Sequence, residues 1–416
     1  MALVLAFGVM LLISVSLSGL AARTVLSTAL LFLVGGALLG PGGFGVVNYT
    51  ADDAIVAVLA DIALFTVLFT DGQRASVPAL REGWRLSGRA LGLGMPLSMI
   101  GIAVPAHYLV GLDWPTAFLL GAILSPTDPV FASALVSRSD IPLRLRRLLN
   151  VESGLNDGLA LPFVLVFLAL AEHADSHLGM VLLELVLGLV IGVGVAALVA
   201  LAWRSKILTV EPRLQPLGPV AIAIVVYAIC HLTHANPYLA AFAAGSALAT
   251  LDHVAAETFE PFGDLLSELT KFAALLLFGA LITPDRLSHL GWQGWLLAIL
   301  AIVVVRPASM LLSLMKTGMP RAEKLTAAWF GPKGFASVVY GLLVLQAGIP
   351  NGDKLFDLIA VTIALSIILH SSTDVPVAHK LRIEPPDHLP AGYDAVRAPE
   401  PEGVAPPING SHDRSP

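Results

Sequence analysis

The run Asn-Val-Glu-Ser-Gly-Leu-Asn-Asp-Gly-Leu-Ala-Leu-Pro, residues 150–162, decides the fold because it places charged side chains within an otherwise apolar segment. On a helix, Glu152 and Asn156 lie one turn apart, as do Ser153 and Asp157. Successive residues differ by about 100° around a helix, so the two pairs form one polar stripe. If the segment lies in a membrane, such a stripe is costly and indicates a functional site.

The composition of the whole chain indicates a lipid environment. Apolar residues make up 56% of the 416 positions and charged residues 13%, about half the ~25% of a soluble domain. The net charge of −6 argues against nucleic-acid partners. The single cysteine, Cys230, excludes an intramolecular disulfide and a multi-cysteine metal site, so we interpret it as a packing residue.

A window of about 20 residues predicts thirteen membrane spans. The second and ninth are short and fit a tilted or re-entrant segment. The first resembles a signal peptide only superficially, because its first positive charge, Arg23, follows the apolar run, and we expect it to be retained. The spans are residues 2–20, 25–40, 54–71, 87–110, 114–136, 150–171, 178–203, 217–232, 237–251, 266–282, 293–315, 324–347 and 356–376.

The distribution of positive charge tests this count. With the amino end outside, all but five of the 24 Lys and Arg residues fall in inside loops or the carboxyl-terminal segment. Of the five, Arg286 and Lys354 lie outside, and Lys271, Arg306 and Lys333 lie within spans. Loops on the cytoplasmic side carry the excess of Lys and Arg. We therefore predict a multi-pass protein of the cell membrane, with its amino end outside and its carboxyl end in the cytoplasm.

The carboxyl-terminal segment differs in composition from the rest. It is rich in proline and poor in apolar residues, so it cannot bury enough surface to fold. We predict a transmembrane domain over residues 1–380 and a disordered cytoplasmic tail over residues 381–416.

Two predicted spans are interrupted by proline. The fifth contains Ser-Pro-Thr-Asp-Pro at 125–129, and the twelfth contains Gly-Pro-Lys-Gly at 331–334. Each proline removes a helical hydrogen bond, and such breaks persist where protein or a wet cavity surrounds them. If the seventh span is a linker, both breaks are fifth in their half, which is typical of inverted-repeat transporters with a site near the midplane. We therefore predict an all-α multi-pass fold of inverted repeats, in which the two broken helices cross. Two unrelated kinks are the alternative.

Asp157 is the residue that we expect to bind the transported ion. Burial disfavours a charged carboxyl and a nearby cation favours it, so one group can hold either a proton or a metal ion. Carboxylate, hydroxyl and carboxamide oxygens are the donors that hard cations prefer. Asp128 and Thr127, in the first break, are the expected neighbours. A structural aspartate at 157 and a helix-cap aspartate at 128 are the alternatives.

Other charged residues receive different interpretations. Arg306 lies mid-span and needs a buried anion, so we predict a fixed Glu152–Arg306 pair that holds the sixth and eleventh spans in register. Glu152 as a direct ligand is the second interpretation. Lys333 either balances charge in the second break or snorkels towards water. Lys271, near the start of its span, is expected to snorkel.

The remaining polar residues of the spans leave alternatives open. Asp71 lies near the cytoplasmic end of the third span, as a solvated terminus or as an ion ligand. Asp61 lies deeper and has no partner evident from sequence. His231 and His234 are interpreted as surface histidines rather than a pH sensor. Gly154 and Gly158 are expected to admit another backbone closely.

Four runs resemble the monovalent cation:proton antiporter-1 family, of the NhaP type. They are SPTDPV at 125–130, NVESGLNDGLALP at 150–162, the Arg306-Pro307 pair and FGPKGFASVVYGL at 330–342. The resemblance spans roughly residues 1–380, with the motifs in order. It implies a homodimer of thirteen-helix protomers, each with a dimer-interface part and a moving core, that exchanges cations for protons without a cofactor.

The resemblance also implies roles for individual residues. Asp157 matches the ion- and proton-binding aspartate, and Asn156 matches the asparagine typical of electroneutral exchangers. Ser153, Thr127 and Asp128 match positions around the ion, and Glu152 and Arg306 match a structural ion pair. The chain departs from the family at three positions: Asp71 stands near the usual glutamate, Lys333 replaces arginine and Phe335 replaces a residue such as valine.

We therefore predict a secondary antiporter, not an enzyme. It exchanges a monovalent cation for H⁺ by alternating access, and Na⁺ is the first candidate for that cation. The lipid bilayer and a second copy of the chain are its expected partners. A K⁺/H⁺ antiporter of the same fold is the alternative. A passive channel and an intramembrane aspartyl protease are less favoured alternatives. The protease would need two aspartates facing one scissile bond, and it would not need Arg306 or the paired breaks.

Overall fold

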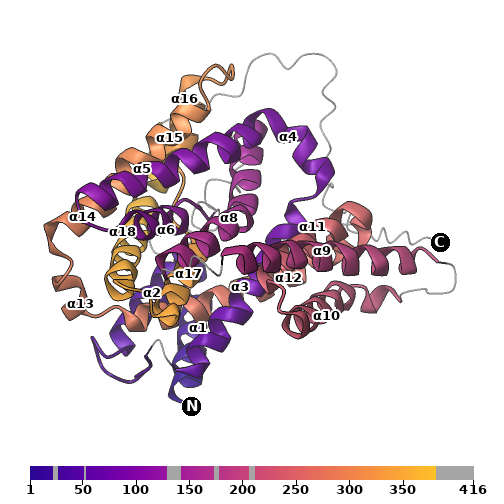
Figure 1. Cartoon of the computed structure of the whole chain (residues 1–416), viewed down its shortest axis with the longest axis horizontal. Coiled ribbons are helices and arrows are strands. Elements are labelled where there is room, and N and C mark those ends of the chain that lie inside the picture. The colour runs from indigo at the N-terminus through magenta and orange to yellow at the C-terminus, as the bar shows by residue number, and fades with distance from the viewer. Residues whose placement is uncertain (22–26, 51–52, 129–141, 173–177, 206–210, 381–416) are drawn as a thin grey trace, which may run out of the picture. The chain divides into compact units, whose positions relative to one another are not determined.

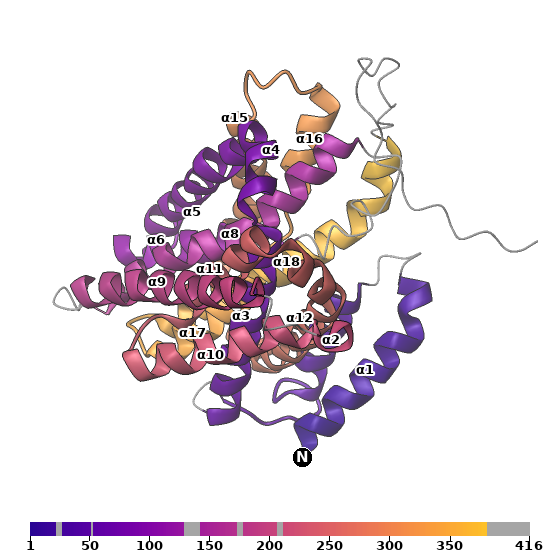
Figure 2. The same ribbon diagram turned by 90° about the vertical axis from the view of Figure 1, so that its right-hand side faces the viewer.

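The computed structural model describes residues 1–21, 27–50, 53–128, 142–172, 178–205 and 211–380, and within these ranges every regular element is a helix (Figures 1 and 2). The tail predicted over residues 381–416 lies outside the described residues. The helices are α1 (Ala2–Ala21), α2 (Thr28–Leu39), α3 (Ala54–Arg74), α4 (Val77–Arg89), η1 (Ala90–Gly94), α5 (Met95–Tyr108), α6 (Trp114–Leu124), α8 (Leu143–Ala171), α9 (Leu178–Trp203), η3 (Pro212–Leu214), α10 (Leu217–Thr233), α11 (Pro237–Leu251), α12 (His253–Leu281), α13 (Pro284–Ser288), α14 (Gly291–Leu300), η4 (Ala301–Val305), α15 (Arg306–Ser313), α16 (Arg321–Trp329), α17 (Phe335–Ala347) and α18 (Gly352–Lys380).

The helices account for all thirteen predicted spans. Each span coincides with one helix or with consecutive helices, except that residues 25–26 of the second span and 129–136 of the fifth are not described. In the described part of the chain, six helical segments are long and apolar enough to cross a membrane, and six apolar helices are shorter. The all-α multi-pass architecture is therefore confirmed, and the count of thirteen crossings stays a prediction.

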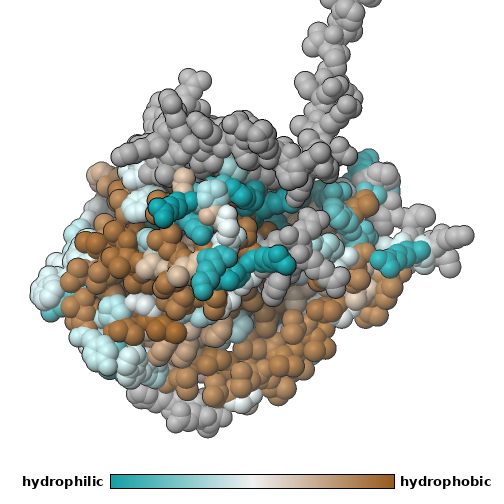
Figure 3. Space-filling model, turned by 90° about the horizontal axis from the view of Figure 1, so that it is seen from above, coloured by the Kyte–Doolittle hydropathy of each residue, from teal (hydrophilic) through white to brown (hydrophobic). Residues whose placement is uncertain are grey.

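The outer surface is apolar over large areas. On α9, for example, Leu183, Val190 and Leu198 are 57%, 62% and 70% exposed. Figure 3 shows hydrophobic residues over much of the face in view, with the most hydrophilic residues in a band across its upper part. Apolar patches of this extent are rare on soluble monomers. The surface therefore suits the lipid environment that the composition predicts.

The fourth and eleventh spans share an unusual local structure. Each contains a five-residue π-helical turn, η1 in one and η4 in the other. The helix that follows carries a proline in its first turn in both cases, Pro96 in α5 and Pro307 in α15. α15 packs on η1 and α5 packs on η4, so the two spans contact each other reciprocally. With α9 as linker, both spans are fourth in their half, which fits an internal repeat.

The two proline breaks meet. α6 ends at Leu124 before the first break, and the second break separates α16 from α17. The backbone N–H of Asp128 donates to the carbonyl of Pro332 at 3.1 Å. A Cβ on Gly334 would overlap the Cβ of Asp128, so this approach requires glycine. The two breaks therefore cross as the sequence predicts.

The expectation for Gly154 and Gly158 is wrong. A Cβ on Gly158 would meet the ring of Phe242 rather than a backbone, and one on Gly154 would meet only the Cβ of Arg74, at 3.8 Å. The close backbone crossing lies instead at the breaks, because Gly334 faces the Asp128 backbone there. Both glycines of α8 face side chains of neighbouring helices.

Candidate ion-binding site

A hydrogen-bonded group of neutral side chains joins α8 to the first break. Nδ2 of Asn156 donates to Oγ1 of Thr127 at 2.8 Å, and the hydroxyls of Thr127 and Ser153 lie 3.4 Å apart. All three side chains are buried. Oδ1 of Asn156 has no hydrogen-bond partner among the described residues. The group therefore offers one free amide oxygen and two hydroxyls, which are ligand types that suit hard cations.

Asp157 lies beside this group and is 4% exposed. Its backbone carbonyl accepts a hydrogen bond from the hydroxyl of Tyr340 on α17 at 2.9 Å. Its side chain interacts electrostatically with Asp71, Asp128 and Lys271. Three buried acidic residues from α3, the first break and α8 thus influence one another. Such a cluster needs positive charge nearby, which Lys271 and Arg74 supply in part and a bound proton or cation can complete.

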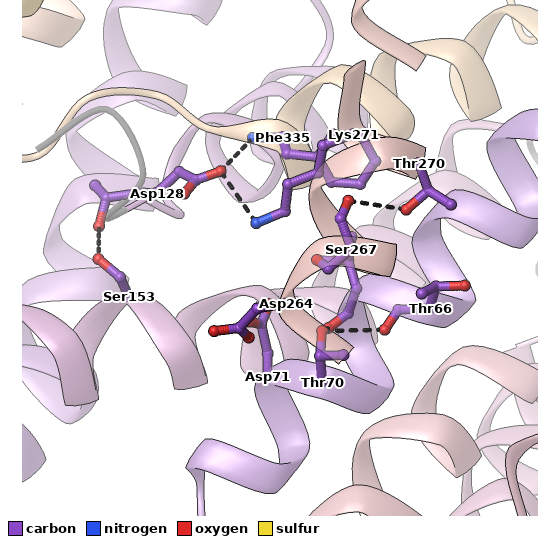
Figure 4. A network of polar contacts seen from close by, with 12 residues as sticks. Thr66, Thr70, Asp71, Asp128, Ser153, Asp264, Ser267, Thr270, Lys271 and Phe335 are labelled. Atoms are coloured by element: carbon purple, nitrogen blue, oxygen red, sulfur yellow. Dashed lines mark hydrogen bonds and ion pairs between the residues drawn. The ribbon is translucent and has the colours of Figure 1, made fainter. Parts of the chain in front are cut away.

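Asp128 connects both breaks to α12. Its Oδ2 accepts a hydrogen bond from the backbone N–H of Phe335, the first residue of α17, at 3.3 Å. The positive end of the α17 dipole therefore faces this carboxylate. Nζ of Lys271 lies 3.7 Å from the same oxygen. Figure 4 shows Lys271 and Phe335 converging on Asp128.

The snorkelling expected of Lys271 is wrong. The residue is 7% exposed, and besides Asp128 its charge interacts with Asp71 and Asp157. It belongs to a polar stripe on α12 with Glu260, Asp264 and Ser267, at spacings of four, three and four residues. This spacing puts all four on one helix face. The stripe is the sequence signal that could have distinguished Lys271 from a lysine at the membrane surface.

Asp71 lies next to Arg74, which lines a polar cavity. It is 4% exposed, so it is not a solvated helix terminus. Nη1 of Arg74 lies 3.4 Å from its Oδ1, and Nη2 of Arg74 lies 2.6 Å from Oδ1 of Asp264. A cavity of about 100 Å³ adjoins these groups. Its lining includes Thr70, Gln73, Arg74, His253, Glu257, Glu260 and Asp264.

A second charged cluster lies on the other side of the second break. Nη2 of Arg306 lies 2.6 Å from Oε1 of Glu152, and both residues are at most 3% exposed. The charge of Lys333, 1% exposed, also acts on Glu152. Lys333 therefore does not reach an aqueous face, and its Nζ has no hydrogen-bond partner among the described residues. A Cβ on Gly331 would overlap the guanidinium of Arg306, so glycine lets the pair lie against the break.

The break itself is fixed to α18. The backbone N–H of Lys333 donates to Oγ of Ser366 at 2.8 Å. Nε2 of His370 lies 3.0 Å from the carbonyl of Trp329, the last residue of α16. These two contacts satisfy backbone groups that the interrupted helix leaves free. They connect α18 to both sides of the proline.

Four other residues considered in the sequence have different surroundings. The carboxylate of Asp61 accepts a hydrogen bond from the hydroxyl of Tyr227 on α10, a partner that the sequence does not reveal. His231 and His234 are exposed, as the surface interpretation predicts. Cys230 is buried in the apolar core, which matches its interpretation as a packing residue.

Comparison with known proteins decides the family. A family model described as the transmembrane sodium/hydrogen exchanger matches residues 9–380. The chain belongs to this family. The family consists of secondary transporters that exchange cations for protons, so the protein is not an enzyme.

Individual relatives are distant. The exchanger is 27% identical over 389 residues to the K⁺/H⁺ antiporter NhaP of Alkalimonas amylolytica, covering 92% of this chain and 67% of that one. It is 28% identical over 288 residues to the Na⁺/H⁺ antiporter 2 of Zygosaccharomyces rouxii, covering 63% of this chain and 33% of the relative. The solved sodium proton antiporter MjNhaP1 of Methanocaldococcus jannaschii has a TM-score of 0.76 at 22% identity, over 92% of this chain and all of that one. This likeness shows that the two share a fold.

Proposed function

We propose that this exchanger exchanges one monovalent cation for one proton, with Na⁺ as the first candidate for the cation. We also propose that the cation and the proton both bind at Asp157. The observation that supports Asp157 is its position among buried carboxylates and neutral oxygens of α8 and the first break. A carboxylate in that position cannot remain both empty and charged at low cost, since burial penalises the bare anion. A proton and a cation therefore compete for it.

The proposed stoichiometry follows from the charges. Asn156 supplies a neutral amide, so the stripe on α8 carries one carboxylate facing Thr127 and Asp128 rather than two. One proton or one monovalent cation changes the charge of the site equally. The exchange is then electroneutral. A dependence of the transport rate on membrane potential contradicts this proposal.

The proposed route places the cavity beside Arg74 on the cytoplasmic side. It rests on the excess of Lys and Arg in the loops at that end. Glu257, Glu260 and Asp264 line the cavity, so it attracts cations. We propose alternating access, in which the crossed breaks move with the ion site relative to a homodimer interface in the cell membrane.

Transport by the reconstituted protein tests the proposal. An imposed pH gradient should drive Na⁺ uphill into proteoliposomes, which separates an antiporter from a passive channel. Asp157→Asn and Asp157→Ala should abolish exchange, whereas Asp285→Asn, at an exposed aspartate of α13, should leave it unchanged. If both Asp157 variants exchange normally, the site is wrong.

The second candidate is K⁺/H⁺ exchange on the same site. It is favoured by the match to the K⁺/H⁺ antiporter NhaP over 92% of this chain. The same proteoliposomes decide between the two candidates when Na⁺, K⁺ and Li⁺ are compared at equal concentration. A KM for K⁺ well below that for Na⁺ replaces the first candidate with the second.

A further inference from the structure

Lys271 is a buried cation inside a site proposed to bind cations. Nζ lies 3.7 Å from Oδ2 of Asp128, and the side chain is 8% exposed. The charged groups that act on it are Asp128, Asp71 and Asp157, which attract it, and Arg74, which repels it. Burial disfavours the ammonium form and the three carboxylates favour it, and the carboxylate 3.7 Å away is the partner that an ammonium group requires at this position.

The ammonium group has the properties of a transported ion. It is a compact single positive charge with three donors on a flexible stem. Oδ2 of Asp128 already accepts a hydrogen bond from the backbone of Phe335, so this carboxylate has a partner without Lys271. A separation of 3.7 Å is longer than a well-formed charged hydrogen bond. The contact is therefore a loose ion pair, which a mobile cation is able to displace.

The ammonium group of Lys271 also has a second favourable contact. Its Nζ lies 5.9 Å from the ring centroid of Phe335, within the range in which a cation is attracted to an aromatic face. In Figure 4 the Lys271 side chain extends from α12 between Phe335 and Asp128. A short movement of the flexible stem therefore separates the ammonium from Asp128 without exposing it to lipid.

We infer that Lys271 is a tethered competitor of the transported cation. In the empty site its ammonium is paired with Asp128, and an incoming monovalent cation displaces it from the carboxylate. The competition weakens cation binding and so speeds release on the far side. Lys271 adds the same charge to the proton-loaded and cation-loaded sites, so the exchange stays electroneutral. This inference rests on the proposed function of the same site.

The test compares Lys271→Met with Lys271→Arg in proteoliposomes at alkaline pH, where protons compete least. Lys271→Met should lower the KM for the cation about tenfold and reduce turnover, because release slows. Lys271→Arg keeps the charge and should stay within about threefold of the parent KM. Lys354→Met, at an exposed lysine, should change neither quantity.

Cation-dependent thermal stabilisation of the purified protein measures binding directly. Lys271→Met should be stabilised at about tenfold lower cation concentration than the parent. If Lys271→Met unfolds in detergent, Lys271→Gln provides the neutral, polar replacement for both measurements. A neutral variant that is folded and exchanges with an unchanged or higher KM overturns the inference and leaves the proposed function standing. If the unsubstituted protein shows no cation/proton exchange, the proposed function is overturned instead.

Discussion

Nη2 of Arg306 and Oε1 of Glu152 lie 2.6 Å apart, with neither residue more than 3% exposed. Glu152→Gln leaves Arg306 as a buried charge without its anion. We expect this variant to lose about 3–5 kcal/mol of stability. Its unfolding temperature in detergent measures the loss.

The exposed pair of Arg213 and Glu211 provides the control for this prediction. Its atoms lie 3.8 Å apart and its side chains are 83% and 60% exposed. Arg213→Gln should change stability by less than about 1 kcal/mol. Equal losses of stability from the two substitutions would show that the Glu152–Arg306 pair does not hold α8 and α15 together.

Gly334 permits the crossing of the two breaks, and replacing it tests that crossing. The Cβ of Gly334→Ala would overlap Asp128, whose backbone is fixed to Pro332. Because backbone must move, we expect the variant to lose more than the 1–3 kcal/mol typical of overpacking. Gly194→Ala on α9 meets no atom within 4 Å, and it should gain about 0.5–1 kcal/mol. The expression level and the unfolding temperature in detergent measure the stability of both variants.

Tyr340 fixes α17 to α8 through the carbonyl of Asp157. Tyr340→Phe removes this hydrogen bond, and we expect it to cost about 1 kcal/mol of stability. Because the backbone of Asp157 is then less firmly held, the exchange rate should fall several-fold. Tyr108→Phe, at a tyrosine that is 76% exposed, serves as the control. An exchange rate of Tyr340→Phe equal to that of Tyr108→Phe would argue against a role in positioning.

Arg74 places positive charge between the polar cavity and Asp71. Arg74→Gln removes that charge, so a cation entering through the cavity is repelled less. We expect the KM for cation added on the cytoplasmic side to fall a few-fold, more at low ionic strength than at high. Arg204→Gln, whose parent side chain binds the carbonyl of Leu251, should leave the KM unchanged. A higher KM for Arg74→Gln would mean that Arg74 positions Asp71 instead.

Much of the fold was predictable because the cost of burying polar groups leaves a clear pattern in the sequence. The apolar runs locate the helices, and the prolines near Asp128 and Lys333 locate the breaks. The polar stripe from Glu152 to Asp157 needs only the helical repeat to be recognised. These features are local, so a single stretch of chain contains all the information for each.

Lys271, Asp61 and Gly158 were misjudged or left open because their partners are far away in the chain. Lys271 lies near the start of a predicted span, which suggests contact with water, yet α12 passes beside the crossed breaks and brings Nζ to Asp128. Asp61 meets Tyr227 from a helix more than 150 residues later. Gly158 faces the ring of Phe242 rather than a backbone. Sequence spacing carries no information about such contacts between helices.

The second break has one further consequence. Gly331 lies against the guanidinium of Arg306, and three residues later Gly334 lies against Asp128. A four-residue segment is thus a direct mechanical link between the Glu152–Arg306 pair and Asp128, one of the carboxylates proposed to bind the ion. Its two outer positions leave no room for a methyl group, so the segment transmits a displacement from one cluster to the other with almost no slack. Substitutions at the Arg306 end should therefore change the binding of the cation, although none of these residues contacts it.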